Sequence, residues 1–394
     1  MDPFAQLPAE LNQQILIHIA DDFVAIENLI SASSRVHAVF RAQPSIIHDL
    51  ILANPITSFP EIQRLCYNIS LIHTSHYTDF AHSQQVCEGT PDLDYRASLG
   101  IIHLAAGVQR LACTCLSLIQ QNFSSALSEI PVAGSLSGPE RAEKARKPFS
   151  WIEEYRTYWS LFHLQHYSAL RKAATGSWNW PAQSIQDLDA YNIWNEILSG
   201  NDEQIWTIAA LLSDLGLTPS YGHYAEELTR SRWFKMDTEG AESSHAAWEF
   251  PEATPIPFFH SFNLPPSESM PIWSLPPIPP ENEATTSSRW QLAPEWRSRA
   301  PMHVKYFRRE NRIVSRARSP SLGLSHFRPW RRLGLVIWDT WRIYTVGLCY
   351  FPSRGPGLDP PNPDGSVFEA GHEKPDFGDL GLRWLALVGQ LPGE

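Results

Sequence analysis

A pair of cysteines in this sequence has a spacing that could suggest a metal site. Cys113 and Cys115 are separated by one residue, and His103 lies upstream of them. Thiolates and imidazoles are protein ligands that zinc prefers. The apolar pattern around them predicts a helix, however, and helical residues two positions apart point in nearly opposite directions. Both thiols therefore cannot reach one ion, and we predict that they belong to a hydrophobic core.

Two histidine pairs are better placed for metal binding, because residues three positions apart share one face of a helix. They are His73 with His76 and His163 with His166. Neither pair has a further Cys, His or carboxylate at motif spacing, so we expect ordinary core or surface histidines. The sequence also lacks the motifs of phosphate loops, dinucleotide-binding folds, zinc peptidases and serine hydrolases. We therefore predict no catalytic residue, metal or cofactor, and a chain that is not an enzyme.

The composition is that of a protein with a large hydrophobic core. The chain has 394 residues, of which 43% are hydrophobic and 19% are charged, and this length suggests two or three structural units. Five cysteines without framework spacing, and a first stretch of 20 residues without a secretion signal, indicate a reducing compartment, the cytoplasm or the nucleus. The longest apolar stretches are interrupted by polar residues, so no membrane segment is predicted.

Apolar residues recur at helical spacing from residue 8 to about residue 235. The clearest stripe runs from Ile101 to Ile119 and predicts one buried helix face. Gly216 suits a left-handed helix C-cap. Further helices are predicted at 60–74, 150–174, 184–199, 201–215 and 222–234. The predicted fold is therefore all-α, with most of the tryptophans of this region in its core.

The composition changes at about residue 237. Residues 251–301 contain twelve prolines, which cannot continue helices. Residues 289–332 contain twelve basic and two acidic residues, a local charge of +10 in a chain whose net charge is −11. We predict a flexible, Pro-rich and basic insertion over 237–330. Its basic part is expected to be a solvated loop, with an import or phospho-regulated segment and nucleic-acid binding as alternatives.

The C-terminal segment has an apolar pattern of its own. Its spacings of four, four, three and four suit a helix, although the β-branched content leaves a strand possible. The residues of this pattern are Leu333, Ile337, Trp341, Tyr344 and Leu348. We expect this helix to pack back on the helical domain.

The N-terminal residues carry the clearest functional pattern. Leu7-Pro8 places a proline at a first helical position, where its missing N–H costs nothing. Asp22 can cap a second helix, and a third short helix carries Val36 and Phe40. Three helices in about 40 residues have too little interior to bury every apolar stripe. At least one face should therefore pack on the rest of the chain or on another protein.

This pattern resembles the F-box in its divergent filamentous-fungal form. The matching motifs are Leu-Pro-x-Glu-Leu from Leu7, Ile-Leu-x-x-Ile from Ile15, and Ser-x-x-Ser-Arg-x-x-x-x-Phe from Ser31, within residues 4–53. The resemblance implies a small helical unit that binds a Skp-type adaptor protein and thereby links a substrate-binding region to a cullin-RING (SCF-type) ubiquitin ligase. It implies an adaptor-facing surface formed by Leu7, Pro8, Leu11, Ile15, Leu16, Ile26, Leu29 and Val36.

A later stretch extends the resemblance along the chain. The segment from Arg331 to Arg342, with Trp338-Asp339 near its end, looks like the closing segment of long fungal F-box-like proteins. The expected organisation is an F-box-like unit at 1–56, a helical domain at 57–236, the insertion at 237–330 and a C-terminal segment at 331–394. The implied function is that of a substrate-recruiting adaptor of the ligase, with an unidentified protein substrate.

Two other classes of function stay open at this point. One is a non-catalytic helical scaffold whose N-terminal hairpin is part of its own core. The other is an enzyme on a helical scaffold, which would need convergent polar side chains in an apolar pocket. The burial of three residues distinguishes the scaffold hypothesis from the adaptor hypothesis. In a scaffold, Leu11, Ile15 and Ile19 should all pack against residues beyond 60.

Overall fold

The structure is a computed structural model, and it confirms the all-α class. It describes residues 2–72, 74–83, 91–129, 137–191, 201–217, 271–278, 331–348 and 387. Within these ranges the regular elements are all helical, and no strand occurs. The predicted helix at 222–234, the basic part of the insertion up to residue 330 and His73 lie outside the described residues.

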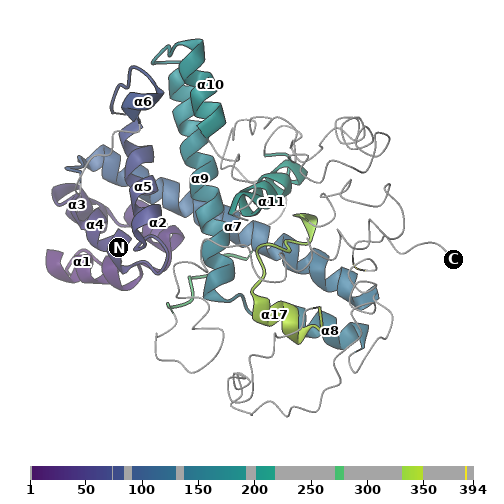
Figure 1. Cartoon of the computed structure of the whole chain (residues 1–394). Coiled ribbons are helices and arrows are strands. Elements are labelled where there is room, and N and C mark those ends of the chain that lie inside the picture. The colour runs from purple at the N-terminus through teal and green to yellow at the C-terminus, as the bar shows by residue number, and fades with distance from the viewer. Residues whose placement is uncertain are drawn as a thin grey trace, which may run out of the picture.

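The helices follow one another with short connections in the first half of the chain (Figure 1). They are α1 (Ala9–His18), α2 (Phe23–Ala32), α3 (Ser34–Ala42), α4 (Ile46–Ala53), α5 (Pro60–Ile72), α6 (Phe80–Ser83), α7 (Tyr95–Glu129), α8 (Gly138–Ala145), α9 (Trp151–Thr175), α10 (Ala182–Tyr191), α11 (Asn201–Asp214) and α17 (Thr340–Thr345).

The first four helices form the N-terminal unit. Helix α1 packs against α3 and α4, and α2 packs against α3 and α7. The predicted cap of α2 is confirmed, because the Asp22 carboxylate accepts a hydrogen bond of 2.8 Å from the Ala25 N–H. Ser33 caps α3 in the same way, accepting from the Val36 N–H at 3.1 Å. These caps fix where each short helix begins.

Helix α7 is the centre of the fold. It has 35 residues and contacts α2, α5, α8, α9 and α11, and Figure 1 shows it running across the molecule with α9 in front of it. Its predicted stripe is buried except for the half-buried Leu118, and much of the rest of its circumference is buried as well. Among the described helices α7 is long and apolar enough to cross a membrane, but 78% of its apolar window is buried inside the protein, as in a core helix.

Buried apolar residues from the whole described chain form one continuous cluster. It includes Leu16 of α1, Ile26 of α2, Ile101 of α7 and Trp338 near the C-terminus. The regions predicted as separate units at 1–56 and 57–236 therefore share one hydrophobic core.

The C-terminal segment packs on this core with less helix than its pattern predicts. Over the span of this pattern the described helix is Thr340–Thr345, and residues 333–337 form turns. Gly334 explains part of the difference, because its φ of +62° belongs to the left-handed region. An added Cβ there would lie 2.7 Å from Ile119 Cδ1. Eight residues of the predicted insertion, 271–278, also lie against the helical body.

Candidate functional site

One face of α1 carries apolar side chains toward solvent. Leu11 and Ile15 are four residues apart in α1 and therefore share this face, and Leu7 and Pro8 lie directly before the helix. The Leu11 side chain is 44% exposed, Pro8 is exposed, and Leu7 and Ile15 are half-buried. Leu11 does not pack into the core, in contrast to what a self-contained scaffold would require.

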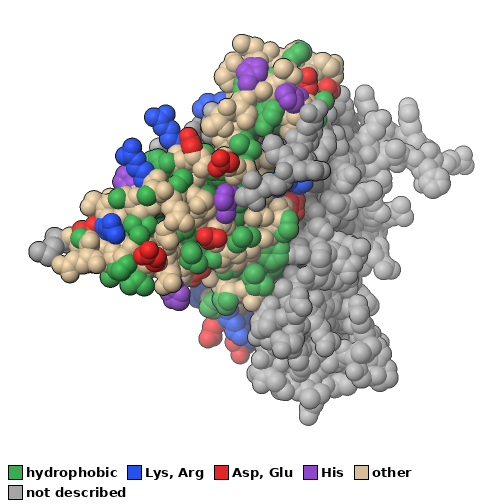
Figure 2. Space-filling view, turned by 90° about the vertical axis from the view of Figure 1, so that its left-hand side faces the viewer, with side chains coloured by type: hydrophobic (Ala, Val, Ile, Leu, Met, Phe, Trp, Pro, Cys, Tyr) green, Lys and Arg blue, Asp and Glu red, His purple; other side chains and the backbone are tan. Residues whose placement is uncertain are grey.

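Helix α4 adds a second exposed leucine. Leu52 is 58% exposed, the largest exposure among the large hydrophobic side chains that the structure describes as exposed. Helix α4 packs on α1, and both belong to the side of the molecule seen in Figure 2, where hydrophobic side chains lie between charged ones. We call Leu7, Pro8, Leu11, Ile15 and Leu52 the apolar face.

The opposite side of α1 anchors the helix. Leu16 is fully buried, and the buried Asn12 Nδ2 donates to the carbonyl oxygens of Leu7 (3.3 Å) and Pro8 (3.0 Å). Arg35, from the Ser-Arg pair of the sequence motif, also donates to the Leu7 carbonyl at 3.3 Å. These contacts fix the start of α1 and hold the apolar face outward.

The structure divides the eight predicted adaptor-facing residues into two groups. Leu7, Pro8, Leu11 and Ile15 reach the surface to different degrees, as described above. Leu16, Ile26 and Val36 are buried in the chain's own core, and Leu29 is half-buried against it. In this arrangement the second group is not free to touch a partner. Leu16 follows Ile15 directly, and one residue turns a helix by about 100°, so the two side chains point to different sides.

Contacts of one carboxylate with two basic side chains fix the N-terminal unit on α7. Glu27 of α2 pairs with Arg110, and Glu27 Oε1 lies 2.6 Å from His103 Nδ1. Burial raises the pKa of Glu27, but hydrogen bonds from His103 and Arg110 lower it by more, so the net shift is downward. Helix α2, and with it the apolar face, is thereby held at a defined position on the central helix.

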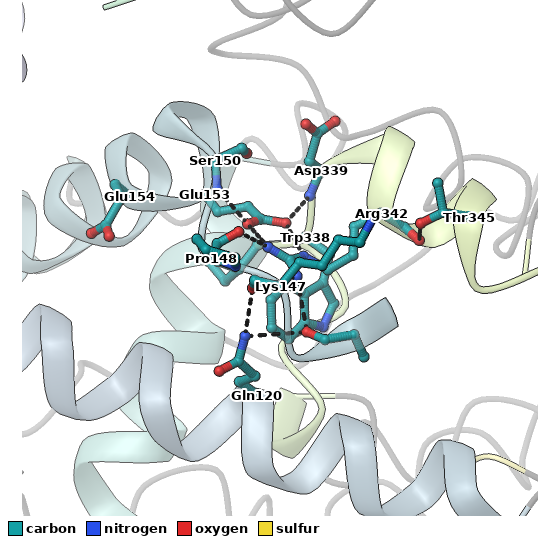
Figure 3. Close-up of polar contacts among 12 residues, drawn as sticks. Gln120, Lys147, Pro148, Ser150, Glu153, Glu154, Trp338, Asp339, Arg342 and Thr345 are labelled. Atoms are coloured by element: carbon teal, nitrogen blue, oxygen red, sulfur yellow. Dashed lines mark hydrogen bonds and ion pairs between the residues drawn. The ribbon is translucent and has the colours of Figure 1, made fainter. Parts of the chain in front are cut away.

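The C-terminal segment is held by a buried ion pair, which Figure 3 shows in close-up. Arg342 Nε and Nη2 donate to the two carboxylate oxygens of Glu153, each at 2.7 Å. Glu153 is fully buried and also accepts from the Asp339 N–H at 3.0 Å and the Ser150 N–H at 2.9 Å. Because every oxygen is paired, the burial of this charge is compensated.

The remaining donors of Arg342 bind the end of α8 and the loop that leads to α9. Its Nη atoms donate to the carbonyl oxygens of Ala145, Lys147 and Pro148 at 2.8–3.0 Å. Its guanidinium carbon lies 5.0 Å from the ring centre of Trp338. The segment that looks like a family's closing motif thus has a structural role here, because it completes the core.

The candidate metal ligands are not assembled into a site. Cys113 and Cys115 are buried in α7, as predicted, and burial raises the pKa of each thiol to about 12, so both are protonated at neutral pH. His163 Nε2 lies 3.2 Å from Glu61 Oε1. Among the described residues no three His, Cys, Asp or Glu side chains lie together as a metal site would require.

The sequence reading missed Leu52 and the Glu153–Arg342 pair. The exposure of Leu52 could have been predicted, because α4 carries apolar residues on more sides than one core can cover.

Comparison of the chain with protein-family models, with curated proteins and with solved structures finds no match. A function is therefore proposed from the residues of this chain alone.

Proposed function

We propose that this chain is a non-catalytic, substrate-recruiting subunit of a cullin-RING ubiquitin ligase. It binds a Skp-type adaptor through the apolar face of α1 and α4. The observation that carries the proposal is the exposure of Leu11 and Leu52 on two helices that pack together, inside the segment that resembles an F-box. The ubiquitin-transfer chemistry belongs to partner proteins in this proposal.

The energetics of the apolar face support such an interface. Burying a leucine completely stabilises a complex by about 1.5–3 kcal/mol, so two half-exposed leucines contribute about 2 kcal/mol together. Interfaces obtain most of their affinity from a few such central residues. The half-buried Leu7 and Ile15 extend the same surface, and the fixed start of α1 reduces the loss of entropy on binding.

The second candidate is a helical scaffold that binds no ligase. The burial of Leu16, Ile26 and Val36 in the shared core favours the scaffold, because these side chains of the N-terminal unit then stabilise the chain's own fold. The exposure of Leu11 favours the adaptor. The two candidates differ in one measurable property, which is binding to the adaptor.

Calorimetry with the full-length chain and a purified Skp-type adaptor tests the proposal. The wild-type chain should bind with a Kd at or below about 1 μM, in the range of specific interfaces. The double variant Leu11→Asp with Leu52→Asp should bind at least about 100-fold more weakly, since two charges then enter an apolar contact.

The control is Ile272→Asp, which places one such charge on a residue of similar exposure (45%) outside the N-terminal unit. This variant should bind like the wild type. Circular dichroism should show unchanged helix content in all three proteins. If the folded wild-type chain binds no adaptor, the scaffold becomes the better explanation.

A further inference from the structure

An eight-residue segment of the chain lies on the helical body like a bound peptide. Residues 271–278 read Pro-Ile-Trp-Ser-Leu-Pro-Pro-Ile and contain no charged side chain. They contain no helix or strand and contact residues of α7 and α9 and the start of α2. Figure 1 draws this segment in green beside the lower end of α9. All of these contacts are made to residues more than a hundred positions away.

Two side chains of the segment pack in or against the hydrophobic core, and Pro276 beside them is half-buried. Leu275 is buried, and Trp273 is half-buried and packs against the core. Ile272 and Ile278 are 45% and 40% exposed. In an extended chain residues two positions apart point to the same side. The segment therefore binds by two anchors and leaves most of its other side chains exposed to water, unlike a core element.

The tryptophan anchor is recognised by its shape and by its polar atom. Trp273 Nε1 donates a hydrogen bond of 2.6 Å to Glu154 Oε1. The indole stacks on Phe149, with ring centres 5.5 Å apart and an interplanar angle of 16°. Phe149 in turn stacks on Trp338 at 6.1 Å. A side chain without both an aromatic face and an N–H donor cannot make this pair of contacts.

The backbone of the segment is recognised as well. Gln109 Nε2 donates to the Trp273 carbonyl at 3.0 Å, and the Leu275 N–H donates to the Asp21 carbonyl at 3.1 Å. Cys113 Sγ lies 4.0 Å from the same Trp273 carbonyl. Backbone hydrogen bonds together with selected side chains are the usual way in which proteins bind extended peptides.

The receiving residues are held in place by contacts that do not involve the segment. Gln109 Oε1 accepts from the Val24 N–H, and Gln109 Nε2 also donates to Asp22 Oδ1, both at 3.0 Å. The Asp22 carboxylate caps α2 at the same time. We call Asp21, Asp22, Gln109, Cys113, Phe149 and Glu154 the indole site.

Two polar atoms beneath the indole site have no hydrogen-bond partner among the described residues. They are Glu154 Oε2 and the Tyr158 hydroxyl, both on buried side chains of α9. Within the described part of the chain, the Glu154 carboxyl group accepts one hydrogen bond, from the indole of Trp273. A buried polar group usually has its hydrogen-bond partners in the core, whereas the Glu154 carboxyl group receives its hydrogen bond from Trp273 of a surface segment. That arrangement is expected of a recognition site.

We propose that the indole site recognises an extended, uncharged segment of a partner protein with tryptophan two residues before leucine, and that residues 271–278 occupy the site as a competing internal ligand. Asp21 and Asp22 at its edge disfavour acidic segments. Ser274 Oγ donates to Asp22 Oδ2 at 3.4 Å, so a hydrogen-bond donor between the two anchors is favoured. This inference goes beyond the ligase proposal and does not depend on it.

The internal segment sets how strongly a partner must bind. A tethered ligand has an effective concentration on the order of 1 mM. If the free segment binds the empty site with a Kd of about 10 μM, the tethered segment weakens the apparent affinity of a competitor by about 100-fold. A partner peptide should therefore bind poorly to the wild-type chain and well to a chain whose own anchor is removed.

The experiment uses the full-length chain and a fluorescently labelled synthetic peptide with the sequence of residues 271–278. Peptide binding is followed by fluorescence anisotropy. The variant Trp273→Ala should bind the peptide saturably, about 100-fold more tightly than the wild type does. The matched control Ile272→Ala changes the neighbouring exposed side chain and should behave like the wild type. A peptide carrying alanine in place of its tryptophan should bind neither protein.

Three outcomes would overturn the inference. One is the absence of saturable binding to a folded Trp273→Ala chain. Another is equal binding of the peptide that lacks tryptophan, and the third is equal affinity for wild type and Trp273→Ala. Should Trp273→Ala unfold, Trp273→Phe keeps the aromatic ring and removes only the N–H donor, and it should raise peptide affinity at least several-fold over the wild type. No rise with that variant also refutes the inference.

Discussion

The buried carboxyl group of Glu154 makes the stability of this protein fall as the pH rises. Burial is the main cause that raises the pKa of Glu154 from 4.5 to about 8, and the hydrogen bond from Trp273 lowers it by less. Between these two values the folded chain keeps a proton that the unfolded chain has released. The free energy of unfolding contributed by this group is therefore complete below pH 4.5 and is lost as the pH rises toward about 8.

The size of this loss follows from the shift. One titrating group changes the free energy of unfolding by at most about 1.4 kcal/mol per pH unit inside the window. From about pH 5 to about pH 7.5 the loss is thus about 3 kcal/mol, a large part of the 5–15 kcal/mol that stabilises a typical domain. The variant Glu154→Gln removes the titration and keeps an oxygen that can accept from the Trp273 indole.

Urea unfolding at a series of pH values measures the effect. The difference between Glu154→Gln and wild type should move in favour of the variant by about 3 kcal/mol between about pH 5 and pH 7.5. Other groups cancel in this difference. The control Glu143→Gln, on an exposed residue of α8, should give a curve parallel to that of the wild type. A Glu154→Gln curve that is also parallel to the wild type would refute the reasoning.

Two further predictions concern the C-terminal segment. Arg342→Met leaves the buried Glu153 carboxylate without its ion-pair partner and should lower the free energy of unfolding by about 3–5 kcal/mol in chemical denaturation, whereas Arg342→Met with Glu153→Gln should recover part of this loss. A loss below about 1 kcal/mol would contradict the role of the pair. Gly334→Ala meets both a positive φ and the Ile119 side chain, so it should destabilise by about 1–3 kcal/mol more than Gly216→Ala, where φ is also positive but nothing lies within 4 Å. Equal melting temperatures of the two variants would show that Ile119 adapts without cost.

The parts of the fold that depend on local sequence were predictable. The cap at Asp22 and the left-handed Gly216, with a φ of +71°, follow from the chemistry of single residues and are confirmed. Helices α5, α9 and α11 lie within two residues of their predicted bounds, because apolar periodicity and turn residues mark them. The buried stripe of α7 follows from periodicity in the same way.

The parts that depend on distant contacts were not predictable. Periodicity places Leu11 and Leu16 in one apolar helix, but only the packing of α1 on α3 and α4 determines that Leu16 is buried and Leu11 is exposed. Prolines around Trp273 indicate an irregular segment, and they say nothing about Phe149 and Glu154, which receive the indole. For the apolar face, Leu11 and Ile15 of α1 reach the surface as predicted, whereas the predicted Leu16 is buried and the exposed Leu52 of α4 was not predicted.

The distance along the chain between Glu153 and Arg342 has a consequence during synthesis. A ribosome adds about 5–20 residues per second, so the 189 positions between the two residues take about 10–40 s to make. During that time the Glu153 carboxylate of α9 lacks its ion-pair partner, because Arg342 has not yet been synthesised. The nascent protein therefore cannot complete its core until residues 331–348 emerge, and a product that stops earlier keeps an open core that chaperones and proteases can recognise.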